Sequence, residues 1–67
     1  MIDMRLNSIK LVTAMMRHDL TQKQLAERAG VSRATISGIK CGRSCSDRVG
    51  MKIAAALQVP IEKLLEN

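Results

Sequence analysis

Apolar residues return every three or four positions along most of the chain, which is the spacing of amphipathic helices. The first such stretch predicts a helix from about Met4 to Arg17. Its expected inward face carries Leu11, Ala14, Met15 and His18, widened by Leu6, Ile9, Val12 and Met16. This apolar surface is wider than a lone amphipathic helix needs, so we expect the helix to be covered on two sides.

The segment from Leu20 to Gly42, LTQKQLAERAGVSRATISGIKCG, predicts two short helices joined by a tight turn. Thr21 and Gln24 have the spacing of a capping box at the start of the first of these helices. Leu20 and Leu25 flank that cap at the spacing of a hydrophobic staple, which fixes how the chain enters the helix.

A glycine and a serine separate this helix from the next. Gly30 suits the left-handed residue that ends a helix, and Ser32 can cap the helix that follows. Ile36 and Ile39 then point inward at helical spacing, and Gly42 offers a second left-handed stop. This is the layout of a helix-turn-helix, in which the second helix of the pair enters the DNA major groove.

Two further helices are predicted towards the end of the chain. Ser46 can cap a helix from about Asp47 to Leu57, and Pro60 can open a last short helix. Their inward positions are Val49, Ile53, Ala56 and Leu57, then Ile61, Leu64 and Leu65. The predicted fold class is therefore all-α, a compact bundle of about five short helices. Residues 1–67 are expected to form one domain, with the motif at residues 20–42.

The composition agrees with a small helical bundle. A chain of 67 residues can form one small domain, and without Phe, Tyr or Trp its core must consist of Leu, Ile, Val, Met and Ala. Charged residues interrupt the apolar runs throughout, so neither a transmembrane segment nor a signal peptide is expected. We therefore expect a cytoplasmic protein that does not contact membranes.

The net charge of +5 is concentrated around the helix-turn-helix. Asp47 is the only acidic residue between positions 28 and 52. The basic residues of that interval are Arg28, Arg33, Lys40, Arg43, Arg48 and Lys52. Phosphate neutralisation requires such a local cluster, although a solvated basic face without a partner has the same composition. Because proteins that bind single strands stack bases on aromatic rings, and this chain has none, double-stranded DNA is the favoured partner.

Cys41 and Cys45 are the side chains that most suggest chemistry. Zinc sites use four Cys or His ligands and only His18 is added here, so we expect no metal, no cofactor and no small-molecule ligand. Both thiols should be reduced in the cytoplasm, and oxidation would disturb phosphate contacts beside the second motif helix. Because no nucleophile–base pair or carboxylate pair stands out, we expect no catalytic residues and no enzyme activity.

Several motifs stand in register along the chain. They are LTQKQLA at 20–26, AGVS at 29–32, Ile36 with Ile39, Gly42, KIAAAL at 52–57, Val59, Leu64 and Leu65. In these residues the chain resembles the lambda-repressor-like, or Xre/Cro-type, helix-turn-helix family from Leu11 to Leu65 without gaps. The resemblance implies a bundle of about five helices whose third helix recognises DNA.

The resemblance also implies roles for individual residues. Base edges or the groove beside them would be contacted by Arg33, Ala34, Thr35, Ser37 and Gly38. Phosphates would be contacted by Gln22, Lys23, Ser32, Lys40, Arg43 and Arg48. A dimer surface would include Gln58, Pro60, Ile61 and Lys63. Arg33 suits a guanine, but a contact with phosphate alone is the alternative. Gly38 fits either a close approach of DNA to the backbone or simple tolerance of a glycine.

The chain departs from the family pattern at four positions. Cys41 replaces a polar residue, often Asn; Cys45 stands where Pro is common; Met15 stands where Arg is frequent; and Gln58 replaces the usual Gly. The two cysteines bear on the phosphate contacts of the linker, and the other two residues bear on packing.

These features predict a sequence-specific transcriptional regulator, a repressor or Cro-like protein that binds a palindromic operator as a homodimer. Its recognition helices would lie one helical turn of DNA apart, about 34 Å. The alternative is an antitoxin-type protein-interaction module that sequesters a toxin and binds DNA to regulate its own synthesis. A toxin-binding extension would favour the alternative, and the chain ends at Asn67, almost directly after the last helix. A third hypothesis is a DNA-binding domain cut from a longer protein.

Overall fold

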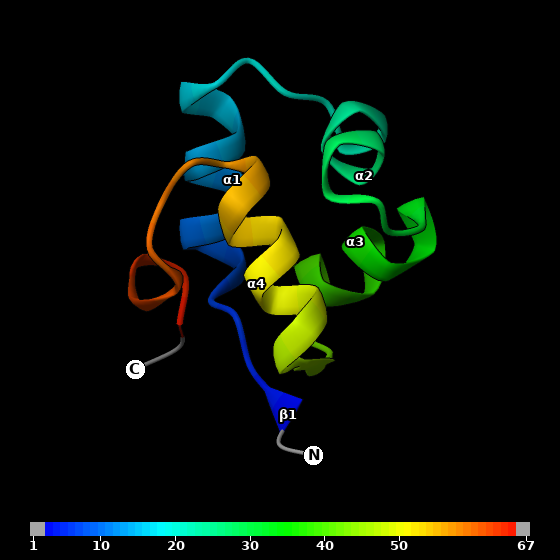
Figure 1. Cartoon of the computed structure of the whole chain (residues 1–67), viewed down its shortest axis with the longest axis vertical. Helices are drawn as coiled ribbons and strands as arrows, with labels where there is room; N and C mark the ends of the chain where they lie inside the picture. Colours follow the sequence, from blue (N-terminus) through cyan, green and yellow to red (C-terminus); the bar gives the residue numbers. More distant parts are fainter. Residues whose placement is uncertain (1–2, 66–67) are drawn as a thin grey trace.

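The computed structural model describes residues 3–65, in which short helices surround one apolar core (Figure 1). The α-helices are α1 (Ser8–Arg17), α2 (Gln22–Ala29), α3 (Arg33–Lys40) and α4 (Asp47–Ala56). The other elements are the strands β1 (Asp3–Met4) and β2 (Cys45–Ser46) and the 3₁₀ turn η1 (Ile61–Lys63). This arrangement confirms the predicted helical bundle. None of the described helices is long and apolar enough to cross a membrane.

The predicted caps of α2 are present. The Thr21 hydroxyl accepts a hydrogen bond from the Gln24 backbone N–H at 3.1 Å, and the Gln24 side-chain carbonyl accepts one from the Thr21 N–H at 2.9 Å. These two bonds form the capping box. At the other end, Gly30 has φ +72°, the left-handed conformation that ends the helix.

The predicted serine caps are also present. The Ser32 hydroxyl accepts from the Thr35 N–H at 3.1 Å, which starts α3. The Ser46 hydroxyl accepts from the Val49 N–H at 3.2 Å, which starts α4. Each cap satisfies a backbone donor that has no partner inside its helix, so the helix boundaries follow from single residues in the sequence.

The prediction that the first helix begins at Met4 is wrong. The helix begins at Ser8, because the side chain of Asn7 caps it by accepting from the Lys10 N–H at 3.0 Å. Residues 3–6 are extended, and β1 pairs antiparallel with β2, with Met4 opposite Cys45. The capping Asn7 also donates its backbone N–H to the carbonyl of Leu64 at 2.7 Å, so this segment is held by both the linker and the C-terminal part of the chain.

The wide apolar face predicted for the first helix is wrong as well. Ile9 is 75% exposed, Met16 is 72% exposed, and His18 is also exposed. Leu6 is buried, but it reaches the core from the extended segment and not from α1. The helix therefore buries a single narrow stripe, and its outer face carries apolar side chains on the surface.

Aliphatic side chains fill the core, as the lack of aromatic residues requires. The largest fully buried side chains are Leu11, Leu25, Ile36, Ile39, Ile53, Leu57 and Leu64. They come from all four helices and the C-terminal segment, so the core joins the helix-turn-helix to the rest of the chain. Gly50 belongs to this packing too, because the side chain of Met4 lies where a Cβ of residue 50 would be.

Gln58 adopts the left-handed conformation, with φ +57°, directly after α4. The Val59 N–H donates to the Ala54 carbonyl at 3.0 Å. This closure of the helix requires a positive φ at Gln58, the residue directly before Val59. We predict that Gln58→Gly raises the free energy of unfolding by about 0.5–1 kcal/mol, because glycine adopts this conformation without a Cβ clash. Chemical denaturation checks the prediction. Ala55→Gly, an exposed position inside α4, is the control and should lower the free energy by about 1 kcal/mol.

Candidate nucleic-acid interface

Gln22, the first residue of α2, is bonded to both ends of α3. Its side-chain amide N–H donates to the carbonyl of Arg33 at 3.3 Å, at the start of α3. Its side-chain carbonyl accepts from the Lys40 ammonium at 3.3 Å, at the end of α3. Ala26 and Leu25 of α2 are buried in the same core as the isoleucines of α3. The angle between the two motif helices is thus fixed by core packing and by one bridging side chain.

The outer face of α3 carries mostly short side chains. The core anchors the helix through Ile36 and Ile39, which are 0% and 1% exposed. The residues predicted to contact bases differ in exposure. Three are exposed, Arg33, Ala34 and Ser37, and two are half-buried, Thr35 and Gly38. Short side chains on this face allow a close approach to another surface. In Figure 1, α3 lies on the side of α4 opposite to η1.

Thr35 differs from its predicted neighbours on this helix. Its hydroxyl lies 2.8 Å from the hydroxyl of Ser32, the residue that caps α3. The threonine is therefore engaged with the helix start, and it faces the side of α3 between the core and the outer face. Ser32 itself is exposed.

Exposed cations stand on α3 and on the segments before and after it in the chain. Lys23 and Arg28 stand on α2, Lys40 ends α3, and Arg43 and Arg48 follow in the linker and in α4. Every one of these five side chains is exposed. Asp47 accepts a hydrogen bond from the Arg48 backbone N–H at 2.8 Å, so this carboxylate serves the first turn of α4. Exposed basic side chains thus come from four segments of the chain, which are α2, α3, the linker and α4.

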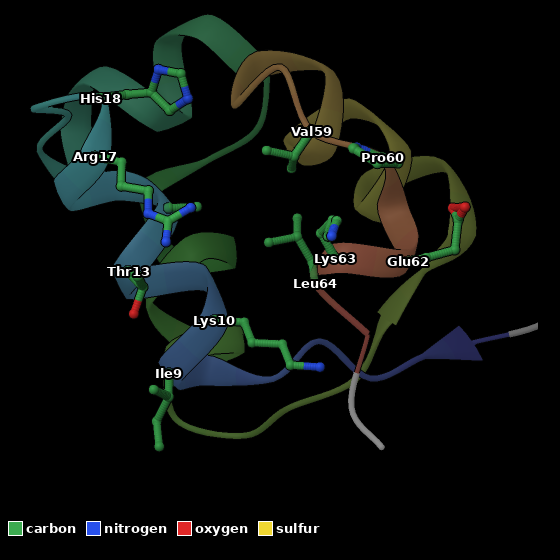
Figure 2. A pocket seen from close by; sticks show the side chains of 11 residues that line it. Ile9, Lys10, Thr13, Arg17, His18, Val59, Pro60, Glu62, Lys63 and Leu64 are labelled. Carbon is green, nitrogen blue, oxygen red and sulfur yellow. The ribbon is translucent and has the colours of Figure 1, made fainter.

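The residues predicted for a dimer surface lie elsewhere. A groove of about 490 Å³ runs between α1 and the segment from Val59 to Leu64, and Pro60 and Lys63 line it (Figure 2). The ammonium of Lys10, also in this groove, donates to the Leu65 carbonyl at 3.1 Å. Gln58 and Ile61 do not line the groove; Gln58 is exposed and Ile61 is half-buried.

The two cysteines occupy different environments. Cys41 caps the end of α3 and is exposed, whereas Cys45 is buried in β2. Among residues 3–65, no group of three His, Cys, Asp or Glu side chains is placed to hold a metal ion.

Comparison with known proteins assigns the fold to a family. The helix-turn-helix family model HTH_3 matches residues 12–64, so the chain belongs to the Cro/C1-type helix-turn-helix family. The membership and the fold make it a DNA-binding protein of the regulator class, as the motifs predict. A search of curated proteins finds no significant match.

Two kinds of protein are among the solved structures with the same fold. The restriction-modification controller protein C.AhdI from Aeromonas hydrophila superposes with a TM-score of 0.81 at 27% identity, over 87% of this chain and 89% of that one. A hydroxyethylphosphonate dioxygenase variant superposes with a TM-score of 0.85 at 23% identity, over 96% of this chain. Native PhpD with cadmium gives a TM-score of 0.83 at 23% identity. This chain spans only 14% of the length of each of those two larger proteins, so their likeness concerns the fold alone.

Proposed function

We propose that this protein is a transcriptional repressor or Cro-like regulator that binds a palindromic operator in double-stranded DNA as a homodimer. The observation that carries the proposal is the outer face of α3, which has short exposed side chains, is flanked along the chain by exposed cations and is fixed to α2 by Gln22. A helix in this setting fits the major groove, where base edges can be read. The likeness to a restriction-modification controller protein supports a role in regulation.

In the proposed complex, the side chains of Arg33, Ala34 and Ser37 contact base edges. The guanidinium of Arg33 is suited to two hydrogen bonds with one guanine, and the methyl group of Ala34 to a thymine methyl. Phosphate contacts come from Lys23, Lys40 and Arg48, together with Gln22 and Ser32 near the helix starts. The phosphate contacts set the position of α3, and the base contacts set the sequence.

Dimer formation is proposed at Gln58, Pro60, Ile61 and Lys63. One copy of so small a domain covers few base pairs, and two copies on an inverted repeat double the sequence that is read. Sedimentation with and without operator DNA distinguishes a stable dimer from one that forms on the DNA.

Selection from a random pool of double-stranded DNA tests the proposal. The expected result is a short inverted repeat with half-sites about 10 base pairs apart, centre to centre. Enrichment of one half-site alone would contradict the dimer. If no sequence were enriched, sequence-specific binding would be contradicted and a role in protein interaction would be favoured. The basic surface would then bind DNA by charge alone.

A further inference from the structure

Arg43 follows α3 in the chain and folds back onto it. Its backbone N–H donates to the Gly38 carbonyl at 2.9 Å, and the Gly42 N–H donates to the Ile39 carbonyl at 3.0 Å. Gly42 between them has φ +96°. These two bonds and the left-handed residue form a Schellman motif, in which the residue after the left-handed one packs on the last turn of the helix.

The position that Arg43 packs on is a glycine. A Cβ at residue 38 would lie 3.2 Å from Cδ of Arg43 and 3.9 Å from its Cβ and Cγ. The hydrocarbon stem of Arg43 therefore runs along the surface that Gly38 leaves open. Glycine is unfavourable inside a helix. Here it leaves space for the hydrocarbon stem of Arg43, which accounts for a glycine at this position.

Gly38 lies on the side of α3 that faces away from the core. Ile36 and Ile39 define the buried side, and helical spacing puts Gly38 nearly opposite, next to Ala34. A hollow of about 340 Å³ beside this face is lined by both Arg43 and Ala34. The stem of Arg43 is thus held on the face that enters the groove, while its side chain stays exposed.

We propose that Gly38 and Arg43 form one recognition unit, in which Gly38 is a positioning residue and the Arg43 guanidinium contacts base edges in the major groove. This inference rests on the proposed function and replaces the phosphate contact that the sequence predicts for Arg43. Because its stem already lies on α3, the guanidinium enters the groove together with the helix. A planar guanidinium there can donate two hydrogen bonds to the O6 and N7 atoms of one guanine.

A double-mutant cycle on operator affinity tests the unit, using the full chain and the duplex selected from the random pool. We expect Arg43→Ala to weaken operator binding about 5- to 150-fold, to weaken random DNA much less, and to relax one operator position. We expect Arg43→Lys to lose the same base preference while it keeps the salt dependence of the wild type. Arg17→Ala, an exposed arginine on α1, is the matched control for loss of charge and should leave the base preference unchanged.

Gly38→Ala provides the second arm of the cycle. Its unfolding temperature should not fall, because alanine favours the helix. Its operator affinity should fall by a smaller factor than that of Arg43→Ala, because the added Cβ shifts the Arg43 stem and does not remove it. In the Arg43→Ala background the same substitution should change affinity little, because there is no stem left to displace. If Gly38→Ala weakened operator binding by the same factor in that background, residue 38 itself would contact the DNA, and the proposed recognition unit would be wrong.

Two other results separate this inference from the function on which it rests. An equal loss of operator and random DNA binding by Arg43→Ala would show a phosphate contact only, and would overturn the inference while the regulator function stands. A wild-type protein that prefers no duplex over any other would contradict the proposed function itself.

Discussion

Replacing Arg33 with alanine is expected to weaken operator binding by about 1–3 kcal/mol, which is about 5- to 150-fold, and to relax the preference at one operator position. Arg33 is exposed in the first turn of α3, and its backbone carbonyl is held by the side chain of Gln22. The substitution removes a side chain that reaches from a fixed backbone position towards the groove. Titration of the variant against operators that carry each base at every position measures both effects.

Lys40→Ala is the control that distinguishes a base contact by Arg33 from a phosphate contact. The Lys40 ammonium lies at the other end of α3, where it donates to the Gln22 side chain, and we assign it to a phosphate. Its loss should weaken all duplexes by a similar factor and lower the slope of log affinity against log salt by about one. If Arg33→Ala instead behaved like Lys40→Ala, with equal losses on operator and random DNA, then Arg33 would contact a phosphate and the assignment to a base would be wrong.

Replacing Ile36 with alanine is expected to lower the free energy of unfolding by about 2–5 kcal/mol. Ile36 is 0% exposed and anchors α3 in the core, so the substitution removes buried methyl groups and leaves a cavity. A domain of this size rarely has more than about 3–5 kcal/mol of total stability from one core. The variant should therefore be largely unfolded at room temperature, which chemical denaturation and circular dichroism measure.

Two controls define that prediction. Ile36→Val, which removes one methylene, should cost only about 0.5–1.5 kcal/mol and leave the protein folded. Met16→Ala, at a position 72% exposed on α1, should change the free energy of unfolding by no more than about 0.5 kcal/mol. A fully folded Ile36→Ala variant, or an equally large loss for Met16→Ala, would mean that the core has been placed wrongly.

The helix-turn-helix could be predicted from the sequence because its signals are local. Thr21, Gly30 and Ser32 each act on backbone groups within four residues of themselves, so their effect can be read without knowing the fold. The isoleucines of α3 follow the helical period with no competing pattern. In the structure the two motif helices begin at the capping residues that the sequence predicts, and each is followed by a predicted left-handed glycine.

The start of the chain could not be predicted in the same way, because its structure depends on distant partners. Leu6 faces Leu65, and Met4 pairs with Cys45, across most of the length of the chain. Apolar spacing alone predicts a helix over these residues. Asn7 was the available signal, since a capping residue at that point predicts the true helix start.

The relation of Gly38 to Arg43 was likewise absent from any single motif. It depends on the turn made by Gly42 and on the bond from the Arg43 N–H to the Gly38 carbonyl, which together bring two residues five positions apart into contact. The conformation of Gln58 had a signal in the sequence, because the family pattern has glycine at that position. The departure from glycine is expected to bear on packing, but the structure shows that it bears on the backbone, because Gln58 has φ +57°.

The ratio of the affinities for a selected and a scrambled duplex tests most directly the claim that this protein reads base edges. The selected duplex and a scrambled duplex of the same length and composition are titrated with the full chain at physiological salt. The account predicts that the selected duplex is bound at least about 10³-fold more tightly, as expected of a regulator that reads base edges. Similar affinities for both duplexes, with the same strong dependence on salt, would contradict it, because the basic surface around α3 would then bind DNA by charge alone.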